Sequence, residues 1–413
     1  MQTKQKKNLL ILGASGAVAH TTLIYLKNHR HLLDKLILTD QRNFEGDSFE
    51  SLKGLDATFI RLQISKETEK DLLNLLKEEK IDVVLDLSDA PTERVAKVIF
   101  EYGKASYICC AFCTESFAPL GEALNEWTDE QKKRKKLGMP HILFTGMNPG
   151  AVDVWAAIGA KKFGKPLEMT EFEYDTSRFM KMHKEKMVTW CVAEFVIELV
   201  TDPAEIILGD HKIKSMYPNG LFYTEDLGPL FSPILKLEKY PQGCVVTHEE
   251  CVTLGNRWDI PCRFIYTVNQ ETMNFIRKTY EAKGKLEDTD LVLANNLKDE
   301  LLGSDNIAVR LDYKDKAVYY FNSASNESLK ECSGTDYQVT TGVFAALFTI
   351  LNDDLKKPGI YYPEDLLDTT FAKFLTDNMM IQEFVFEKRK NGELRLLSHE
   401  PHISYGEGPF VKI

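Results

Sequence analysis

The chain has 413 residues, 44% of them apolar and 27% charged, which is too long for one ordinary core and too apolar for a disordered protein, so we expect two globular domains. The net charge of −11 disfavours a nucleic-acid partner, because a surface that binds phosphates is normally basic. The sequence contains no run of eighteen apolar residues and no segment of the signal-peptide type, so we expect a cytoplasmic protein without a membrane partner.

The first 150 residues alternate between short apolar strands and amphipathic helices. Helical patterns separate most of the apolar runs, which are 8–13, 35–40, 57–64, 81–89, 105–112 and 140–146. Continuously apolar strands between helices predict a parallel sheet that is covered on both faces. We therefore expect an α/β, Rossmann-type doubly wound domain over residues 1–150.

A glycine-rich turn follows the first apolar run, in the sequence NLLILGASGAVAHTTL. Gly13 permits a tight turn, Gly16 lets the backbone approach a pyrophosphate, and Ala19 keeps the helix close to the strand. The amides at the start of that helix would then hold the phosphates. This spacing predicts a dinucleotide site.

An acidic residue, Asp40, ends the second apolar run at the position where a carboxylate binds the adenosine ribose. Because a carboxylate repels a 2′-phosphate, NAD is the expected cofactor, while Arg42 keeps NADP open. Ser88 and Asn148 lie in later strand-end loops and can bind ribose or carboxamide. The candidate cofactor-binding residues are Gly13, Ser15, Gly16, Ala17, Val18, Asp40, Ser88, Asp89 and Asn148.

One familiar enzyme class is excluded by its missing acid–base pair. Short-chain dehydrogenases use a tyrosine followed four residues later by a lysine, and no tyrosine of this chain has a lysine at that spacing. A different proton donor is therefore required.

From residue 151 the pattern changes to aromatic, strand-rich segments that continue to about residue 330, after which helices return. We expect a second, inserted α/β (α+β) domain over residues 151–330. Residues 331–413 are expected to form C-terminal helices that pack back on the Rossmann domain.

Four segments, MNPGAVDVWAA, FEYDTSRFMKMHKEKMVTWCVAEF, VTHEECVTLGNRWDIPCRFIYTV and TDYQVTTGVFAALFTILNDDLKKPGIYYPEDL, resemble the bacterial homospermidine synthases of the saccharopine dehydrogenase-like family. The order of the segments is the same through nearly the whole chain. The most specific anchors are the NPG turn with Val152 and Trp155, Asp175 with Thr176, Thr189 with Trp190, and Thr247 with His248 and Glu250.

The resemblance implies tightly bound NAD, a homodimer formed through the second domain, and polyamine formation. An amine is oxidised to an imine, a second amine exchanges in, and the new imine is reduced. Three departures affect diamine recognition: Ala193 stands at the acid position, Thr267 at a histidine position, and the sequence at 206–210 replaces a Gly-Trp-Gly loop.

An amine substrate is cationic, so its pocket needs carboxylates and aromatic faces. Glu115, Asp153, Glu194 and Glu250 are the candidate carboxylates, with Trp155 and Trp190 as walls or as core. His248 is a candidate general acid or base, and on an extended strand it would share a face with Glu250. The candidate catalytic residues are Glu115, Asn148, Trp190, Glu194, His248 and Glu250.

No metal is expected. The cysteines of CCAFC have no matching pair, and His399 and His402 lack a third ligand at metal spacing.

The sequence thus favours an NAD-dependent oxidoreductase of amine and imine chemistry with a small-molecule amine substrate. An alternative within the class is a saccharopine or carboxynorspermidine type dehydrogenase, with Arg178, Arg257 and Arg263 as carboxylate clamps. A second alternative is a catalytically silent NAD-binding sensor or scaffold.

Overall fold

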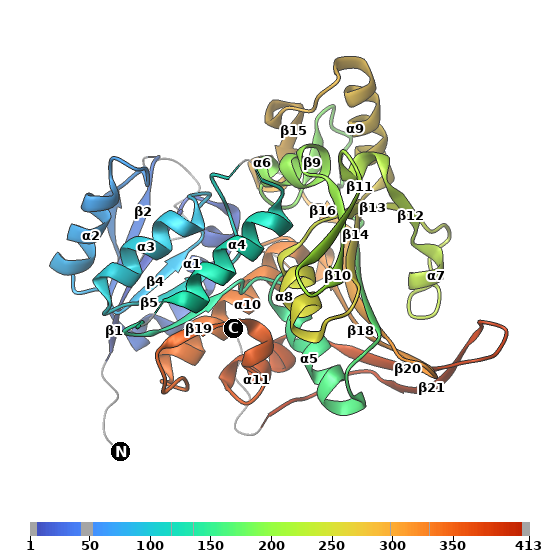
Figure 1. Ribbon diagram of the computed structural model, residues 1–413. Coiled ribbons are helices and arrows are strands. Elements are labelled where there is room, and N and C mark those ends of the chain that lie inside the picture. The colour runs from blue at the N-terminus through green and yellow to red at the C-terminus, as the bar shows by residue number, and fades with distance from the viewer. Residues whose placement is uncertain are drawn as a thin grey trace.

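The structure, a computed structural model, is built on two β-sheets and describes residues 6–42, 53–116, 118–134, 136–297, 299–329 and 331–406. Figure 1 shows the first sheet with its helices on one side of the molecule and the second sheet on the other. The expected class, a doubly wound parallel sheet with a second mixed domain, is confirmed by these two sheets.

The first sheet has seven parallel strands in the order β19-β6-β5-β4-β1-β2-β3. Because the strand order reverses direction at β1, right-handed crossovers place α1 on one face and α2 and α3 on the other. The strands are β1 Lys7–Leu12, β2 Leu33–Asp40, β3 Thr58–Arg61, β4 Val83–Asp86, β5 Ser106–Cys109, β6 Pro140–Leu143 and β19 Gly359–Tyr361. The helices are α1 Ala17–His29, α2 Glu69–Glu78, α3 Thr92–Tyr102 and α4 Leu120–Lys133.

The second sheet is mixed and has ten strands, with the main order β11-β10-β14-β7-β17-β18-β20-β21 and β12 and β13 beside β14. Only β14 and β7 run parallel within it. Its strands are β7 Glu168–Asp175, β10 Ala204–Gly209, β11 Lys212–Tyr217, β12 Thr224–Asp226, β13 Gln242–Val246, β14 Cys262–Val268, β17 Ser304–Asp312, β18 Lys316–Ser325, β20 Gln382–Lys388 and β21 Leu394–Glu400.

Three helices lie between the two sheets (Figure 1): α5 Ala151–Phe163, α8 Glu249–Trp258 and α10 Gly334–Leu351. Helix α10 contacts α1 and β5 of the first unit as well as β17 and β18 of the second. Most of the buried apolar side chains of both units therefore form one continuous core.

The C-terminal region divides between the sheets. α10 packs on the first unit, and β19 adds a strand to its sheet. By contrast, β20 and β21 extend the second sheet, so residues 331–413 are not the purely helical segment that the sequence predicts. Within the described residues, no helix combines the length and the apolar character needed to cross a bilayer.

Small elements complete the molecule around the second sheet. Short strands pair as β8 with β16 and β9 with β15. These elements are α6 Val192–Val196, α7 Gly228–Phe231, α9 Gln270–Lys283, α11 Thr370–Asn378, β8 Arg178–Phe179, β9 Lys186–Val188, β15 Leu291–Leu293 and β16 Leu301–Leu302.

Candidate functional site

The glycine-rich turn joins β1 to α1 at the carboxyl edge of the first sheet. Gly13 has a φ of +72°, and a Cβ on it would lie 2.5 Å from the carbonyl oxygen of Leu87, in the loop after β4. Gly16 is the N-cap of α1, and its amide donates to the Gly13 carbonyl at 3.1 Å. The turn therefore packs directly on the neighbouring loop, with Ala17 and Val18 in the first turn of α1.

Asp40 closes the same edge from the end of β2. Its Oδ2 accepts hydrogen bonds from the amide and the hydroxyl of Ser15, at 2.9 and 2.6 Å, and its Oδ1 accepts from the Arg42 amide. The carboxylate thus fixes the glycine-rich turn. A carboxylate oxygen has two lone pairs, so these bonds leave acceptor capacity for a ribose hydroxyl.

The loop after β4 is held by a buried carboxyl group, Asp86. The hydroxyl of Ser88 donates to Asp86 Oδ1 at 2.6 Å, and the Tyr107 hydroxyl donates to its Oδ2 at 2.8 Å. Burial raises the pKa of Asp86 to about 6, although these donors oppose the shift. Ser88 is thereby placed beside Gly13, and Asp89 follows it in the same loop.

The inner face of β7 carries three successive acids. Side chains alternate along a strand, and Phe172 belongs to the core on the outer face, so Glu171, Glu173 and Asp175 face inward. All three are buried. Burial raises the pKa of each of them, and neighbouring carboxylates add to the shift of Glu171 and Glu173.

Glu173 connects this strand to the first sheet. Its Oε2 accepts a hydrogen bond of 2.9 Å from Nδ2 of Asn148, in the loop after β6. The candidate residue Asn148 therefore lies between the nucleotide edge and the acidic strand.

Polar partners gather at the carboxyl end of β7. Asp175 accepts from the Thr189 hydroxyl at 2.7 Å, and Asp305 accepts from the Thr335 hydroxyl at 2.6 Å. Burial and the charge of Asp175 raise the pKa of Asp305 to about 8. The other oxygen of Asp305 has no hydrogen-bond partner within the described part of the chain.

His248 is the one imidazole in this acidic region, and the prediction that it lies on an extended strand is wrong. His248 is the N-cap of α8, which begins at Glu249. Its Nδ1 nevertheless lies 2.8 Å from Glu250 Oε2. Burial lowers the pKa of His248, but Glu250, Glu198 and Glu249 outweigh burial and raise it to about 10, so the imidazole is charged at neutral pH.

Glu250 is fully buried beside Glu171. These two carboxyl groups and the thiol of Cys251 place ligand atoms within 4.8 Å of one another. His248, Glu249 and Glu250 form a second set of this kind. Such sets can hold an ammonium group, because carboxylates stabilise a cation.

Two contacts join these acids to the loop after β5. Glu249 Oε1 accepts from the Phe112 amide at 2.6 Å, and the Cys113 thiol lies 3.9 Å from Glu194 Oε1. Burial, together with the charges of Glu249, Asp89 and other acids, raises the pKa of Glu194 to about 7. Glu194 therefore belongs to the same region.

The two candidate tryptophans have different surroundings. Trp190 is half-buried, and its indole N–H donates to the Tyr266 hydroxyl at 3.0 Å. Trp155 lies within the core and is fully buried, as is Asp153, which accepts from the Gly150 amide at the start of α5. Of the two rings, Trp190 is the one next to the acids, because Tyr266 is paired with Glu173 across β14 and β7.

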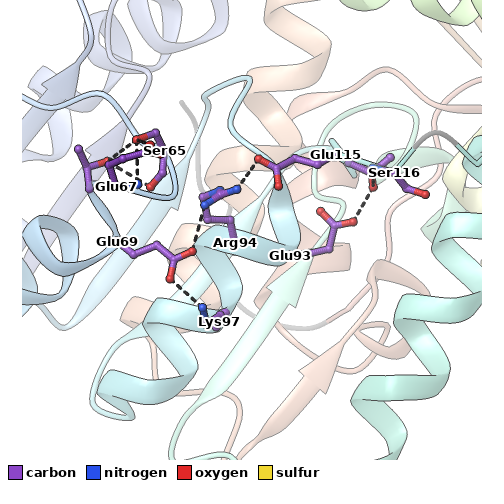
Figure 2. Close-up of polar contacts among 10 residues, drawn as sticks. Ser65, Glu67, Glu69, Glu93, Arg94, Lys97, Glu115 and Ser116 are labelled. Atoms are coloured by element: carbon purple, nitrogen blue, oxygen red, sulfur yellow. Dashed lines mark hydrogen bonds and ion pairs between the residues drawn. The ribbon is translucent and has the colours of Figure 1, made fainter.

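Glu115 lies apart from the acidic region. Figure 2 shows its ion pair with Arg94, which also binds Glu69 at 3.0 Å. Its side chain is 60% exposed.

The three candidate carboxylate clamps do not meet. Arg257 pairs with Glu364 and Asp365, Arg263 pairs with Glu168 and Glu225, and Arg178 is exposed on β8. Arg263 lines a cavity of about 330 Å³ on the outer face of the second sheet.

Four acids of the site are not among the candidates that the sequence predicts: Glu171, Glu173, Glu198 and Asp305. The alternation of EFEYD shows which of these residues share a face, but it does not show that the acidic face is the buried one. A signal for the helix at 249–258 was available, because Glu249 and Glu250 are the acids that a first helical turn favours.

No protein-family model matches the chain, and no curated protein sequence matches it. Among solved structures, an engineered D-amino acid dehydrogenase bound to NADP+ is 8% identical, with a TM-score of 0.43, and covers 87% of this chain and 94% of its own. A mutant of meso-dapdh from Clostridium tetani E88 with DAP is 12% identical, with a TM-score of 0.42. The match covers 87% of this chain and 94% of that chain.

A dihydrodipicolinate reductase from Paenisporosarcina sp. TG-14, with dipicolinate bound, is 11% identical, with a TM-score of 0.38. The match covers 88% of this chain and 100% of that chain. Because every one of these TM-scores is below 0.5, the fold assignment depends on the sheet orders above and not on these matches.

Proposed function

We propose that this chain is an NAD-dependent oxidoreductase that moves a hydride between nicotinamide and a carbon bearing nitrogen. Its substrate is a small cationic amine that binds between the carboxyl edge of the first sheet and the inner face of β7. The observation that carries the proposal is the set of buried carboxyl groups around His248, since the single charge of one imidazole does not balance so many acids.

The fit of a dinucleotide is supported by the glycine-rich turn. Gly13 allows the turn to pack on the loop after β4, a Cβ at Gly16 would meet only backbone atoms, the nearest at 3.4 Å, and the amides at the start of α1 would bind a pyrophosphate. Asp40 would bind the ribose and repel a 2′-phosphate, which favours NAD over NADP. When bound, the nicotinamide supplies the hydride acceptor and donor.

The fit of an amine is supported by the charge balance on β7. Glu171, Glu173, Asp175 and Asp305 all have raised pKa values, mainly because burial disfavours their ionised forms. A bound ammonium group stabilises their ionised forms. Trp190 adds an aromatic face, and a cation on such a face gains about 0.5 to 2 kcal/mol.

The finer proposal is a homospermidine synthase-like reaction, in which one amine is oxidised, a second amine exchanges into the imine, and the product is reduced. It rests on the segment resemblance and on the number of acids, which suits a substrate with more than one charge. A saccharopine-type substrate needs a carboxylate clamp, and the scattered positions of Arg178, Arg257 and Arg263 disfavour it.

Ligand-dependent unfolding temperatures test the two halves of this proposal separately. We expect NAD at about a hundred times its Kd to stabilise the protein by about 2.7 kcal/mol, and NADP at the same concentration to stabilise it less. We expect putrescine to stabilise it further, and Asp305→Asn to remove the putrescine effect while the NAD effect remains. The neutral analogue 1,4-butanediol is the matched control.

Turnover distinguishes the alternatives. Homospermidine formed from putrescine and NAD supports the finer proposal, and reduction of an imine from lysine and 2-oxoglutarate supports the saccharopine type. Bound NAD without turnover on any amine supports the silent sensor or scaffold. A protein stabilised by neither NAD nor NADP contradicts the oxidoreductase assignment.

A further inference from the structure

Helix α6 continues into a π-helical turn, Ile197–Thr201, that reverses the usual burial of its side chains. Ile197 is 42% exposed, whereas the side chain of the following acid, Glu198, is only 12% exposed. π-turns are rare and costly, and they occur frequently where a functional side chain must be redirected. A buried acid beside an exposed isoleucine is a local conflict of the kind found at functional positions.

Glu198 faces the imidazole on the side opposite to Glu250. Its Oε2 lies 3.9 Å from His248 Nε2, while Glu250 Oε2 lies 2.8 Å from His248 Nδ1. The remaining oxygens of the two acids, Glu198 Oε1 and Glu250 Oε1, have no hydrogen-bond partner in the described ranges. The imidazole is therefore held between carboxyl groups from two elements, with an acceptor atom unused on each.

Glu198 is also the acid of this group that changes its charge just above neutrality. Burial raises its pKa to about 8; the charge of His248 opposes the shift, and Glu249, Glu250 and Asp202 add to it. His248 stays charged over the same range. The ionisable groups that face the pair are Glu173 on β7, Asp202 after the π-turn, Cys244 on β13, and Glu249 and Glu250 on α8.

The geometry leads us to propose that Glu198 is the general base of this site and that His248 is the fixed cation that holds its carboxylate in place. This assignment rests on the proposed amine function. A substrate ammonium group would give one proton to Glu198 Oε1, which leaves a neutral amine and a protonated Glu198. Bound NAD would supply the acceptor for the hydride of the carbon next to that nitrogen. After the second amine has displaced ammonia from the imine and the hydride has been returned, Glu198 would give its proton to the product amine and become a carboxylate again.

The test is the pH profile of putrescine-dependent NAD reduction in the wild type and in three variants. We expect kcat/KM to rise with pH with an inflection near pH 8, because Glu198 must be ionised. Glu198→Gln should lower the rate about 10² to 10⁴-fold and remove this inflection. Glu198→Asp should recover part of the rate, and Glu130→Gln, an exposed acid on α4, should leave the profile unchanged.

A second measurement separates this proposal from the proposed function. NMR titration of the His248 imidazole in the absence of substrate should show a lower pKa in Glu198→Gln than in the wild type, with the fold verified by circular dichroism. An unmoved titration, or a variant within about threefold of the wild-type rate with the same inflection, overturns the assignment of Glu198. A wild type that neither binds nor oxidises an amine overturns the amine function, and the His248 titration then still decides whether the Glu198–His248 pair exists.

Discussion

At the scale of single residues, Gly13 shows how one hydrogen in place of a methyl group makes the nucleotide turn possible. Its backbone lies against the loop after β4, and its φ of +72° is strained for any other residue. A larger side chain at this position therefore has two separate penalties, which are steric overlap with the loop and backbone strain.

These penalties can be separated because Gly284, at the end of α9, has a φ of +71° and open space around it. We expect Gly13→Ala to lower the free energy of unfolding by about 1 to 3 kcal/mol and to abolish NAD binding. Gly284→Ala should carry the backbone strain alone and leave NAD binding intact. Urea denaturation and NAD titration of both variants measure this, and equal NAD affinity in the two would contradict it.

Glu171 is predicted to destabilise the protein increasingly as the pH rises. Burial and Glu250 raise its pKa, so the folded state retains a proton that the unfolded chain loses. A carboxyl group whose pKa is raised in the folded protein stabilises the fold fully at pH values below its pKa in the unfolded chain. This contribution to stability is lost as the pH rises toward the pKa of the group in the folded protein. Glu171→Gln removes the group that must ionise.

We therefore expect the stability of Glu171→Gln, relative to the wild type, to increase between pH 5 and pH 9, measured as the difference in urea midpoints. Glu281→Gln, an exposed acid on α9, is the control and should show no such trend. A difference that stays constant with pH would show that Glu171 is already ionised in the folded protein.

The residues that sequence reasoning found and missed differ for a physical reason. Gly13 and Asp40 were identifiable because a turn and a strand end constrain them locally. Glu173 and Asp305 become site residues only because β7 and β17 pair side by side, with Asp175 opposite Asp305. That pairing depends on contacts more than a hundred residues apart, which no local pattern encodes.

At the scale of whole elements, α10 passes over the loop after β6 with almost no space between them. A Cβ at Gly342 would overlap the carbonyl oxygens of Thr145 and Gly146. The same loop leads to Asn148, which binds Glu173. The position of α10 therefore fixes both the loop and one side chain of the candidate site.

Gly342→Ala should push α10 away from this loop, lowering the unfolding temperature and weakening putrescine binding through Asn148. Gly228→Ala, where the nearest atom is a side-chain oxygen 3.1 Å away, is a milder glycine replacement distant from the loop. Differential scanning calorimetry and putrescine titration compare the two. If Gly342→Ala had the same unfolding temperature as the wild type, this would show that α10 can shift without a loss of stability.

The end of β13 explains why the sequence pattern predicts a strand at the position of α8. β13 ends at Val246, and the apolar run before His248 gives no periodicity that separates a strand from the start of a helix. His248 is not one of the common N-cap residues, and its side chain makes no capping bond, so the N-cap signal is missing and only the acids Glu249 and Glu250 indicate the start of a helix. The strand-rich character of the second domain was predictable, but the place where the strand stops was not.

At the scale of the whole molecule, the buried acids make stability a function of pH and of bound cation. Glu194 and Glu364 have pKa values raised to about 7, and Glu198 and Asp305 to about 8, in each case mainly by burial. The folded state holds their protons more tightly than the unfolded chain does. These groups therefore stabilise the fold in acid, and their contribution is lost as the pH rises through 7 to 8.

We expect the urea midpoint to fall between pH 6 and pH 9 and expect saturating putrescine to reduce this fall, because the ammonium groups pair with the newly ionised acids. 1,4-Butanediol, with the same chain length and no charge, should have no effect. A midpoint that rises over this range, or an equal effect of the diol, contradicts this account of the acidic region.

The distribution of the C-terminal strands also bears on synthesis at the ribosome. β19 completes a sheet whose first strand begins at Lys7, and β20 joins β18 in the other sheet. A nascent chain released at residue 330 would lack α10, the outermost strand of the first sheet and the hairpin of the second. Translation must therefore pass residue 400 before both sheets have neighbours on all their internal strands. The nucleotide-binding half, although made first, is completed only when β19 has been made.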